Sequence, residues 1–349
     1  MTAPALDATD WRKLLAPYKN PSWRLASAQL LSSALPFGLL WALMAMVSGR
    51  SYLLTLLLAV PASFFFVRLF IIQHDCGHGS FFPSRRANNL LGGALGVVTL
   101  FPYGYWKKTH AIHHATSGNL DDREFGDIVT LTVREYRALP LLRRFGYRLY
   151  RHPLVMLGVG PFYQFVIKHR FPFDLPFAWK REWRSVLLTD AALAVVVTAL
   201  GLTVGWTTFA LVQLPIVLIA GAVGVWLFYV QHQFEDTYWE HAEEWDYYRA
   251  GAHGSSFYDL GPVGHWLTGN IGYHHIHHLA SQIPNYRLAA CFRDNPEMQR
   301  VTRLGLRESL RCARLALWDE ERRALVPFRR PALAAADPAA AGPRLATRA

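Results

Sequence analysis

Three clusters of histidines stand out in this 349-residue chain, which contains 15 histidines in all. The clusters read His74-Asp-Cys-Gly-His78, His110-Ala-Ile-His113-His114 and His274-His275-Ile-His277-His278. The first has the spacing i, i+4, and the other two share the spacing i, i+3, i+4. On an α-helix such residues lie on one face about one turn apart, so their imidazoles can approach a metal ion from the same side.

The shared spacing selects eight of these histidines and leaves His275 aside. Eight imidazoles exceed the roughly four to six positions around one ion, so the pattern predicts two metal ions. Imidazole suits zinc, copper, iron and nickel, and the scarcity of cysteine argues against an iron–sulfur cluster or a structural zinc site. Iron with open coordination positions would favour the oxidation of inert C–H bonds by O2, whereas zinc would favour hydrolysis by an activated water.

The composition leaves two classes for this chain, a protein with a large buried core or a membrane protein. Hydrophobic residues make up 52% of the chain and charged residues only 17%, against about 25% charged in ordinary soluble domains. Such a chain is too apolar to be disordered, and its three cysteines are too few for a disulfide scaffold.

Four apolar stretches are long enough to cross a bilayer, which takes about 20 residues. They run over residues 25–49, 51–73, 185–205 and 207–231. Very short turns around Arg50 and Trp206 join them into two hairpins. Four buried helices of a soluble protein are the alternative, but paired runs of this length with so few charges are rare in soluble folds.

The rest of the chain is expected to be extramembranous or interfacial. Stretches 90–103 and 153–167 are apolar but short, which suits interfacial or re-entrant segments. Residues 1–24 are predicted to be a cytoplasmic amphipathic segment, residues 25–330 a single membrane domain, and residues 331–349, rich in Ala, Pro and Arg, a disordered tail.

The distribution of Lys and Arg predicts the orientation. The segment 102–184 carries 14 of these residues and the segment before Leu25 carries four, whereas the two hairpin turns carry only Arg50. By the positive-inside rule, both termini and the middle segment are cytoplasmic. The net charge of +11 then faces anionic headgroups rather than nucleic acid. The three clusters share one side only if the stretch 90–103 does not cross the membrane.

The three histidine clusters, called boxes from here on, resemble those of the membrane fatty acid desaturases in their order and in their placement around two hairpins. This family belongs to the wider group of histidine-box di-iron hydroxylases and desaturases. The resemblance extends from Trp11 to Phe328. Further stretches resemble the bacterial acyl-lipid branch that is similar to Δ12 (omega-6) desaturases. These begin at His114 (HATSGNLD), Gly126 (GDIVTLTVREY), Gln231 (QHQFEDTYW) and Ile283 (IPNYRL).

The resemblance implies an all-α integral membrane protein with four transmembrane helices in two hairpins, interfacial or re-entrant helices and a cytoplasmic helical cap that carries the boxes. It implies two iron ions and O2 as co-substrate, with an acyl chain receiving a cis double bond. The implied iron ligands are His74, His78, His110, His113, His114, His232, His274, His277 and His278. Of these, His232 corresponds to a ligand that the family uses after the fourth span.

Other residues are candidates for supporting roles. Asp75, Asp121, Asp122, Glu235 and Asp236 lie near the ligands in sequence and are candidates to orient imidazoles through the second ring nitrogen, although each could equally be a solvated charge. Tyr105, Trp106 and Tyr273 are candidates for the wall of a substrate tunnel or for an interfacial aromatic belt. The six remaining histidines, His152, His169, His241, His253, His265 and His275, are interpreted as interfacial or supporting residues.

The reaction needs two electrons, and the sequence shows neither a fused haem motif nor a four-cysteine ferredoxin pattern. A separate donor, ferredoxin-like, is therefore expected at the basic cytoplasmic face of a bacterial inner membrane. Three alternatives remain open: a hydroxylase or ketolase on the same scaffold, a zinc-dependent membrane hydrolase, and a metal transporter or sensor. The transporter needs polar residues along the spans, and the fourth span has no charge.

Overall fold

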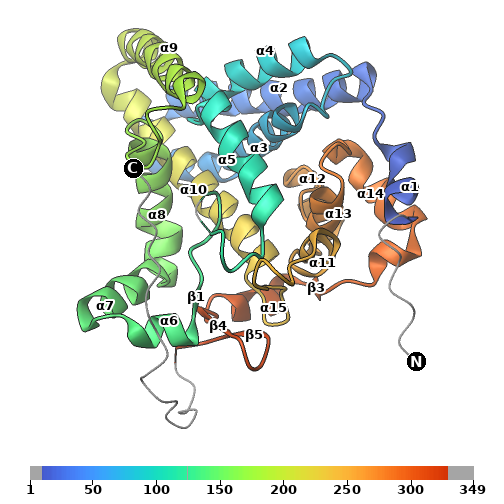
Figure 1. The fold of residues 1–349 in the computed structure, drawn as a ribbon. Coiled ribbons are helices and arrows are strands. Elements are labelled where there is room, and N and C mark those ends of the chain that lie inside the picture. The colour runs from blue at the N-terminus through green and yellow to red at the C-terminus, as the bar shows by residue number, and fades with distance from the viewer. Residues whose placement is uncertain (1–9, 124, 329–349) are drawn as a thin grey trace.

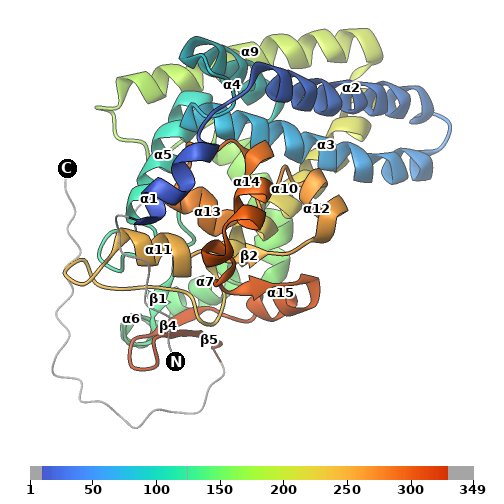
Figure 2. The same cartoon turned by 90° about the vertical axis from the view of Figure 1, so that its right-hand side faces the viewer.

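The computed structural model describes residues 10–123 and 125–328, which form a helical protein with a few short strands (Figures 1 and 2). The predicted tail at 331–349 lies outside the described residues, as do the first nine residues of the predicted N-terminal segment. The rest of that segment begins with α1 (Asp10–Leu15). Trp11 and Leu15 of α1 belong to one buried cluster with Ile276 and Leu279, so the apolar side of this helix faces the protein interior.

Four helices among the described residues are long and apolar enough to span a membrane, which confirms the predicted hairpins. They are α2 (Trp23–Val47), α3 (Tyr52–His78), α9 (Lys180–Val204) and α10 (Trp206–His232). The second turn is tight because Gly205 has a φ of +88°, a backbone conformation that side chains disfavour. The predicted span ends at residue 73, but helix α3 continues to His78. The apolar run marks only the part of the helix inside the membrane, and polar residues continue the same helix beyond it.

Helix α2 shows how these helices divide their surface between lipid and protein. Leu31, Leu35 and Leu39 recur every four residues and are 55%, 60% and 72% exposed. A stripe of this kind on one helix face is costly in water and favourable in a bilayer. The core between α2, α3 and α10 includes Met44 and Phe66. In Figure 2, α2, α3 and α9 run alongside one another across the upper part of the molecule.

The two charged residues inside the predicted spans both have polar partners. Arg68 of α3 is buried, and its guanidinium donates to the Ser33 hydroxyl and the Trp266 carbonyl and lies over the Trp266 ring. Asp190 of α9 forms an ion pair with Arg170, which also donates to the Leu100 carbonyl at 2.7 Å. These contacts satisfy charges that would otherwise be costly within an apolar layer.

Helix α4 (Arg85–Val98) corresponds to the first of the two short apolar stretches. Its 14 residues fall short of the roughly 20 needed to cross a bilayer, and it packs against α3 and α9. The chain then turns at Leu100, whose φ is +66°, and enters α5 (Tyr103–Thr116). Because α4 does not cross, α5 returns on the side where α3 ended. The second short stretch forms two π-helical turns, Val155–Val159 and Tyr163–Lys168, around α8 (Gly160–Phe162).

The remaining elements form a cap of short helices and strands. The helices are α6 (Val133–Ala138), α7 (Leu141–Tyr150), α11 (Tyr247–His253), α12 (Gly261–Leu267), α13 (His274–Leu279), α14 (Asn285–Asp294) and α15 (Leu306–Cys312), with 3-10 turns at Ala16–Tyr18 and Pro296–Gln299. The strands are β1 (Leu131–Thr132), β2 (Phe257–Tyr258), β3 (Arg303–Leu304), β4 (Leu317–Asp319) and β5 (Ala324–Val326).

The strands form two small sheets. Strand β4 lies between β1, with which it is parallel, and β5, with which it is antiparallel, and β2 pairs with β3 in parallel. Leu317 is the register partner of both Leu131 and Val326, and the three side chains share one hydrophobic cluster. The all-α class is therefore confirmed, with strand pairing limited to two or three residues at a time in the part of the chain that the structure describes.

Candidate metal centre

Nine histidines from four helices converge in two adjacent groups. The five-histidine group contains His74, His78, His110, His114 and His277, and the four-histidine group contains His113, His232, His274 and His278. Within each group the candidate ligand atoms lie within 4.8 Å of one another. The structure thus brings together all nine residues that the sequence analysis named as ligands.

The helical spacing explains how two groups arise from shared helices. On α5, His110 and His114 are one turn apart and enter the five-histidine group, whereas His113 lies to one side of them and enters the other group. Helix α13 makes the complementary division, since His274 and His278 enter the four-histidine group and His277 enters the five-histidine group. The i, i+3, i+4 pattern therefore lets one helix hold ligands for two ions.

The nine Nε2 atoms are arranged for cations rather than for hydrogen bonds. Nε2 atoms face one another at 3.0 Å between His74 and His110, 3.2 Å between His110 and His114, 3.0 Å between His114 and His277, and 2.9 Å between His232 and His274. The other three Nε2 atoms, those of His78, His113 and His278, are buried without a hydrogen-bond partner. A neutral imidazole nitrogen either donates or accepts, so such a set cannot satisfy itself and suits two bound metal ions.

The protonation states also suit metal binding. Burial lowers the pKa values of His110, His277 and His278 well below the usual histidine range, and the neighbouring imidazoles lower them further. These three rings are therefore neutral at physiological pH. Neutral imidazole is the form that offers a lone pair to a metal.

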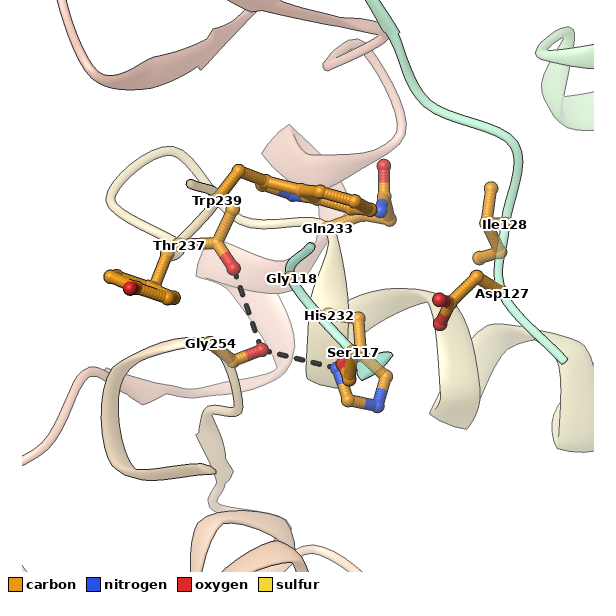
Figure 3. Close-up of a pocket in the computed structure, with 10 residues that line it drawn as sticks. Ser117, Gly118, Asp127, Ile128, His232, Gln233, Thr237, Trp239 and Gly254 are labelled. Carbon is orange, nitrogen blue, oxygen red and sulfur yellow. Dashed lines mark hydrogen bonds between the residues drawn. The ribbon is translucent and has the colours of Figure 1, made fainter. Parts of the chain in front are cut away.

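Three of the rings are oriented through their outward nitrogens. His113 Nδ1 lies 2.5 Å from Asp127 Oδ1, His74 Nδ1 lies 3.2 Å from Asp75 Oδ1, and His232 Nδ1 lies 3.1 Å from the Gly254 carbonyl oxygen. Contacts of this kind fix the tautomer with the proton on Nδ1 and leave Nε2 free for an ion. Figure 3 shows His232 with its bond to Gly254, and Asp127 on the opposite side of a small pocket.

Asp127 is a residue that the sequence analysis did not single out. It is brought to His113 by the segment after α5, where Gly126 has a φ of +80°. A Cβ on Gly126 would lie 2.8 Å from His113 Cβ, so only glycine permits this close approach. The Gly-Asp dipeptide 12 residues after the second box was the available signal, but nothing in it says which imidazole the carboxylate meets.

Of the five carboxylates predicted to orient imidazoles, one contacts a histidine of the two groups. Asp75 contacts His74, and its Oδ2 accepts from the backbone and side-chain amides of Asn285 at 2.6 and 2.8 Å. Asp121 instead accepts from the Ala242 amide and pairs with His241 on the surface. No side-chain bond from Asp122, Glu235 or Asp236 to a clustered histidine occurs among the described residues.

The three aromatic residues predicted to line a substrate tunnel lie in different surroundings. Trp106 stacks on His110 with ring centroids 4.6 Å apart and lies 5.5 Å from the His74 ring. Tyr105 is one residue away but packs into a cluster with Leu175 and Val186. Tyr273 stacks on Phe257 and His265. Trp106 is therefore the one of these three whose ring covers the candidate ligands.

The histidines outside the two groups have other surroundings. His275 is buried, with its Nε2 2.9 Å from the Met298 carbonyl oxygen, and His265 lies 3.4 Å from Asp259. His169 is packed among aromatic rings and lies 3.1 Å from the Gln164 amide nitrogen. His152 and His253 are exposed. None of these belongs to either group.

We expect His169 to destabilise the protein in mild acid. Burial, with Arg170 and Lys168 nearby, lowers its pKa to about 3, whereas in the unfolded chain it titrates near ~6.5. The unfolded state therefore binds more protons below ~6.5, and stability falls as pH drops. Between pH 6.5 and 5 this amounts to about 2 kcal/mol. Thermal unfolding at both pH values should show a weaker acid effect in His169→Asn than in wild type or in the exposed control His152→Asn; identical acid effects would contradict this.

The environment of Asp127 gives a second prediction. Asp127→Asn should keep the shape of the site but lose the charge that holds the His113 proton on Nδ1. We expect metal affinity to fall by about 10- to 100-fold, the usual effect of removing such a partner. Competition with a chelator of known affinity measures this directly. Asp121→Asn is the matched control, because Asp121 contacts His241 instead; equal loss in both variants would contradict the role of Asp127.

Comparison with known proteins gives a consistent result. The family model described as fatty acid desaturase matches residues 50–307. A fatty acid desaturase of Bacillus subtilis (strain 168) is 47% identical over 317 residues, which are 91% of this chain and 90% of that protein. A chloroplastic omega-3 fatty acid desaturase of Brassica napus is 31% identical over 77% of this chain and 67% of its own length. An sn-1 acyl-lipid omega-3 desaturase (ferredoxin) of a Nostoc species is 32% identical over 64% of this chain and 62% of its own length.

Proposed function

The chain belongs to the fatty acid desaturase family, and we propose that it introduces a cis double bond into an acyl chain of a membrane lipid. The observation that carries this proposal is the convergence of nine Nε2 atoms in two groups on four helices, two of which continue from membrane spans. That arrangement supports two redox-active ions beside the layer in which acyl chains lie. In the proposed reaction the chain loses two hydrogens from adjacent carbons, and O2, two electrons and two protons complete the formation of two waters.

We propose iron as the metal in both groups. Imidazole-rich sites with open positions suit iron in O2-dependent oxidation, and bound iron would supply the oxidising power for C–H cleavage. The chain itself holds nine imidazole rings in place, and Asp75, Asp127 and the Gly254 carbonyl orient three of them. The four-histidine group is buried throughout, which keeps bulk water away from the reacting atoms.

The acyl chain is proposed to reach the centre from the bilayer and to pass Trp106. The indole is buried and stacked on His110, so it can position a C–C pair against the ions without a polar group of its own in the path. We propose Δ12 (omega-6-like) selectivity on the basis of the sequence motifs. Several curated relatives are named omega-3 desaturases, so product analysis must discriminate between these positions.

The electron donor is proposed to be a separate ferredoxin-like protein, since relatives are named for ferredoxin. The proposed location is the bacterial inner membrane, with the centre and both termini in the cytoplasm. The support is the excess of Lys and Arg in segment 102–184 and before Leu25. Cysteine-scanning with an impermeant thiol reagent at Arg50 and Arg143 would test this orientation.

Product analysis tests the proposed function. A bacterial host without dienoic fatty acids would express the wild type together with ferredoxin and its reductase, and its lipids would be analysed by gas chromatography with mass spectrometry. We expect a new unsaturated chain whose fragments locate the double bond. Hydroxylated or keto products would instead indicate an oxidase on the same scaffold. No new product from a metal-loaded, membrane-inserted protein would contradict the proposal.

A further inference from the structure

We infer that the exposed side of α5, together with the start of α4, is the docking surface for an acidic ferredoxin-class electron carrier, which passes electrons into the five-histidine group. The inference rests on the proposed function and adds the place of electron entry. We call this surface the α5 face. It consists of Gly79, Arg85, Arg86, Lys107, Ala111 and Ala115.

The two histidine groups differ in their access to the surface. His78 and His110 of the five-histidine group are half-buried, whereas all members of the four-histidine group are buried. A protein carrier cannot enter the molecule, so electrons must pass through whichever group comes closest to a surface that the carrier can touch. The five-histidine group meets that condition.

The centre of the α5 face consists of small residues. Ala111 and Ala115 are exposed and follow His110 and His114 directly in the sequence, and Gly79, also exposed, follows His78. A docked protein would thus meet only a Cβ or backbone atoms beside three candidate ligands. Electron transfer slows steeply with distance, so a surface without long side chains at this point shortens the path.

The rim of the α5 face is basic. Arg85 and Arg86 are exposed at the start of α4, and Lys107 reaches toward α4 from α5. Lys107 also donates to Asn89 Oδ1 at 3.3 Å, which fixes the ammonium beside the start of α4. A concentration of positive charge around an apolar centre favours an acidic partner and speeds its encounter.

The surface beside the four-histidine group carries charges of both signs. Gly118 and Tyr238 line the pocket in Figure 3, and two segments beside it expose the acidic Asp121, Glu243 and Glu244 together with His241 and Arg249. An acidic carrier would find no excess of positive charge there, whereas the α5 face offers Arg85, Arg86 and Lys107. Lipid headgroups would also attract the arginines, but they would not require small residues beside the ligands.

The test measures binding directly. Purified, metal-loaded protein in zwitterionic lipid nanodiscs is titrated with an oxidised, acidic two-iron ferredoxin by isothermal calorimetry. Arg85→Glu/Arg86→Glu should weaken binding at least tenfold. The matched control Arg137→Glu/Arg143→Glu makes the same change in charge at exposed positions of α6 and α7 and should change binding less than twofold. Ala111→Glu, which adds charge and bulk at the centre, should also weaken binding, and metal content should be unchanged in all variants.

Each outcome bears on one proposal at a time. Equal weakening in both double variants, or no weakening in either, would overturn the α5 face as the docking surface. Absence of ferredoxin binding to the wild type, with arginine-dependent binding of anionic vesicles instead, would assign the arginines to lipid and would also overturn it. Normal binding to the α5 face without any unsaturated product would count against the proposed reaction alone.

Discussion

Replacement of His113 by alanine is expected to reduce product formation to below detection while the protein remains inserted in the membrane. His113 is one of only four candidate ligands in its group, and its loss leaves three. The change also leaves the Asp127 carboxylate, 2.5 Å from His113 Nδ1, without its partner in a buried setting. Bound metal should therefore fall from two ions toward one per chain.

The matched control is His253→Ala, because His253 is exposed on α11 and belongs to neither group. Metal content by mass spectrometry, membrane fractionation and fatty-acid analysis should be measured on both variants. Retained unsaturated product in His113→Ala would reject this histidine as a ligand. Loss of product in both variants would indicate a general loss of folding rather than a specific effect on the centre.

Removal of the metal is expected to abolish activity, and only a redox-active ion should restore it. A strong chelator should yield an apo-protein that regains product formation with Fe²⁺ under O2 but remains inactive with Zn²⁺. Zinc has no accessible redox step, although it would bind the same imidazoles. The apo-protein should also unfold at lower temperature, since ions that bind only the folded state stabilise it.

The same experiment separates the alternative functions. Activity restored by zinc without O2 would support a membrane hydrolase and contradict the desaturase proposal. If iron restored a hydroxylated product, the assignment of iron would stand, but the reaction would be hydroxylation rather than desaturation. A thermal midpoint that is the same with and without metal would argue that the two groups do not hold ions in the folded protein.

The spans and the histidines that come together could be predicted from sequence because both signals are local. Four long apolar runs need no tertiary information, and the spacing of His110, His113 and His114 is visible in five consecutive residues. The division of these histidines between two groups was not predicted. It depends on where α10 and α13 pack against α5, and helix spacing alone leaves that open.

The orienting groups were harder to predict because they act across the fold. Asp75 is adjacent to its histidine in sequence, whereas Asp127 reaches His113 only through a turn that requires Gly126. His232 is oriented by a backbone carbonyl. Every residue has such a carbonyl, so the sequence does not show which one makes the contact. Helices α3 and α9 also extend beyond the predicted spans, to His78 and back to Lys180, because hydropathy reports the apolar layer and not the whole hydrogen-bonded helix.

The sharing of α13 between the two groups has a consequence for biosynthesis. The four-histidine group takes two of its four members from this helix, which begins at residue 274 and follows every membrane span. A nascent chain that has inserted all four spans still lacks half of that site. The complete four-histidine group can form only after nearly the whole chain has left the ribosome, so a partly made protein cannot complete the proposed oxidising site beside its own unfolded segments.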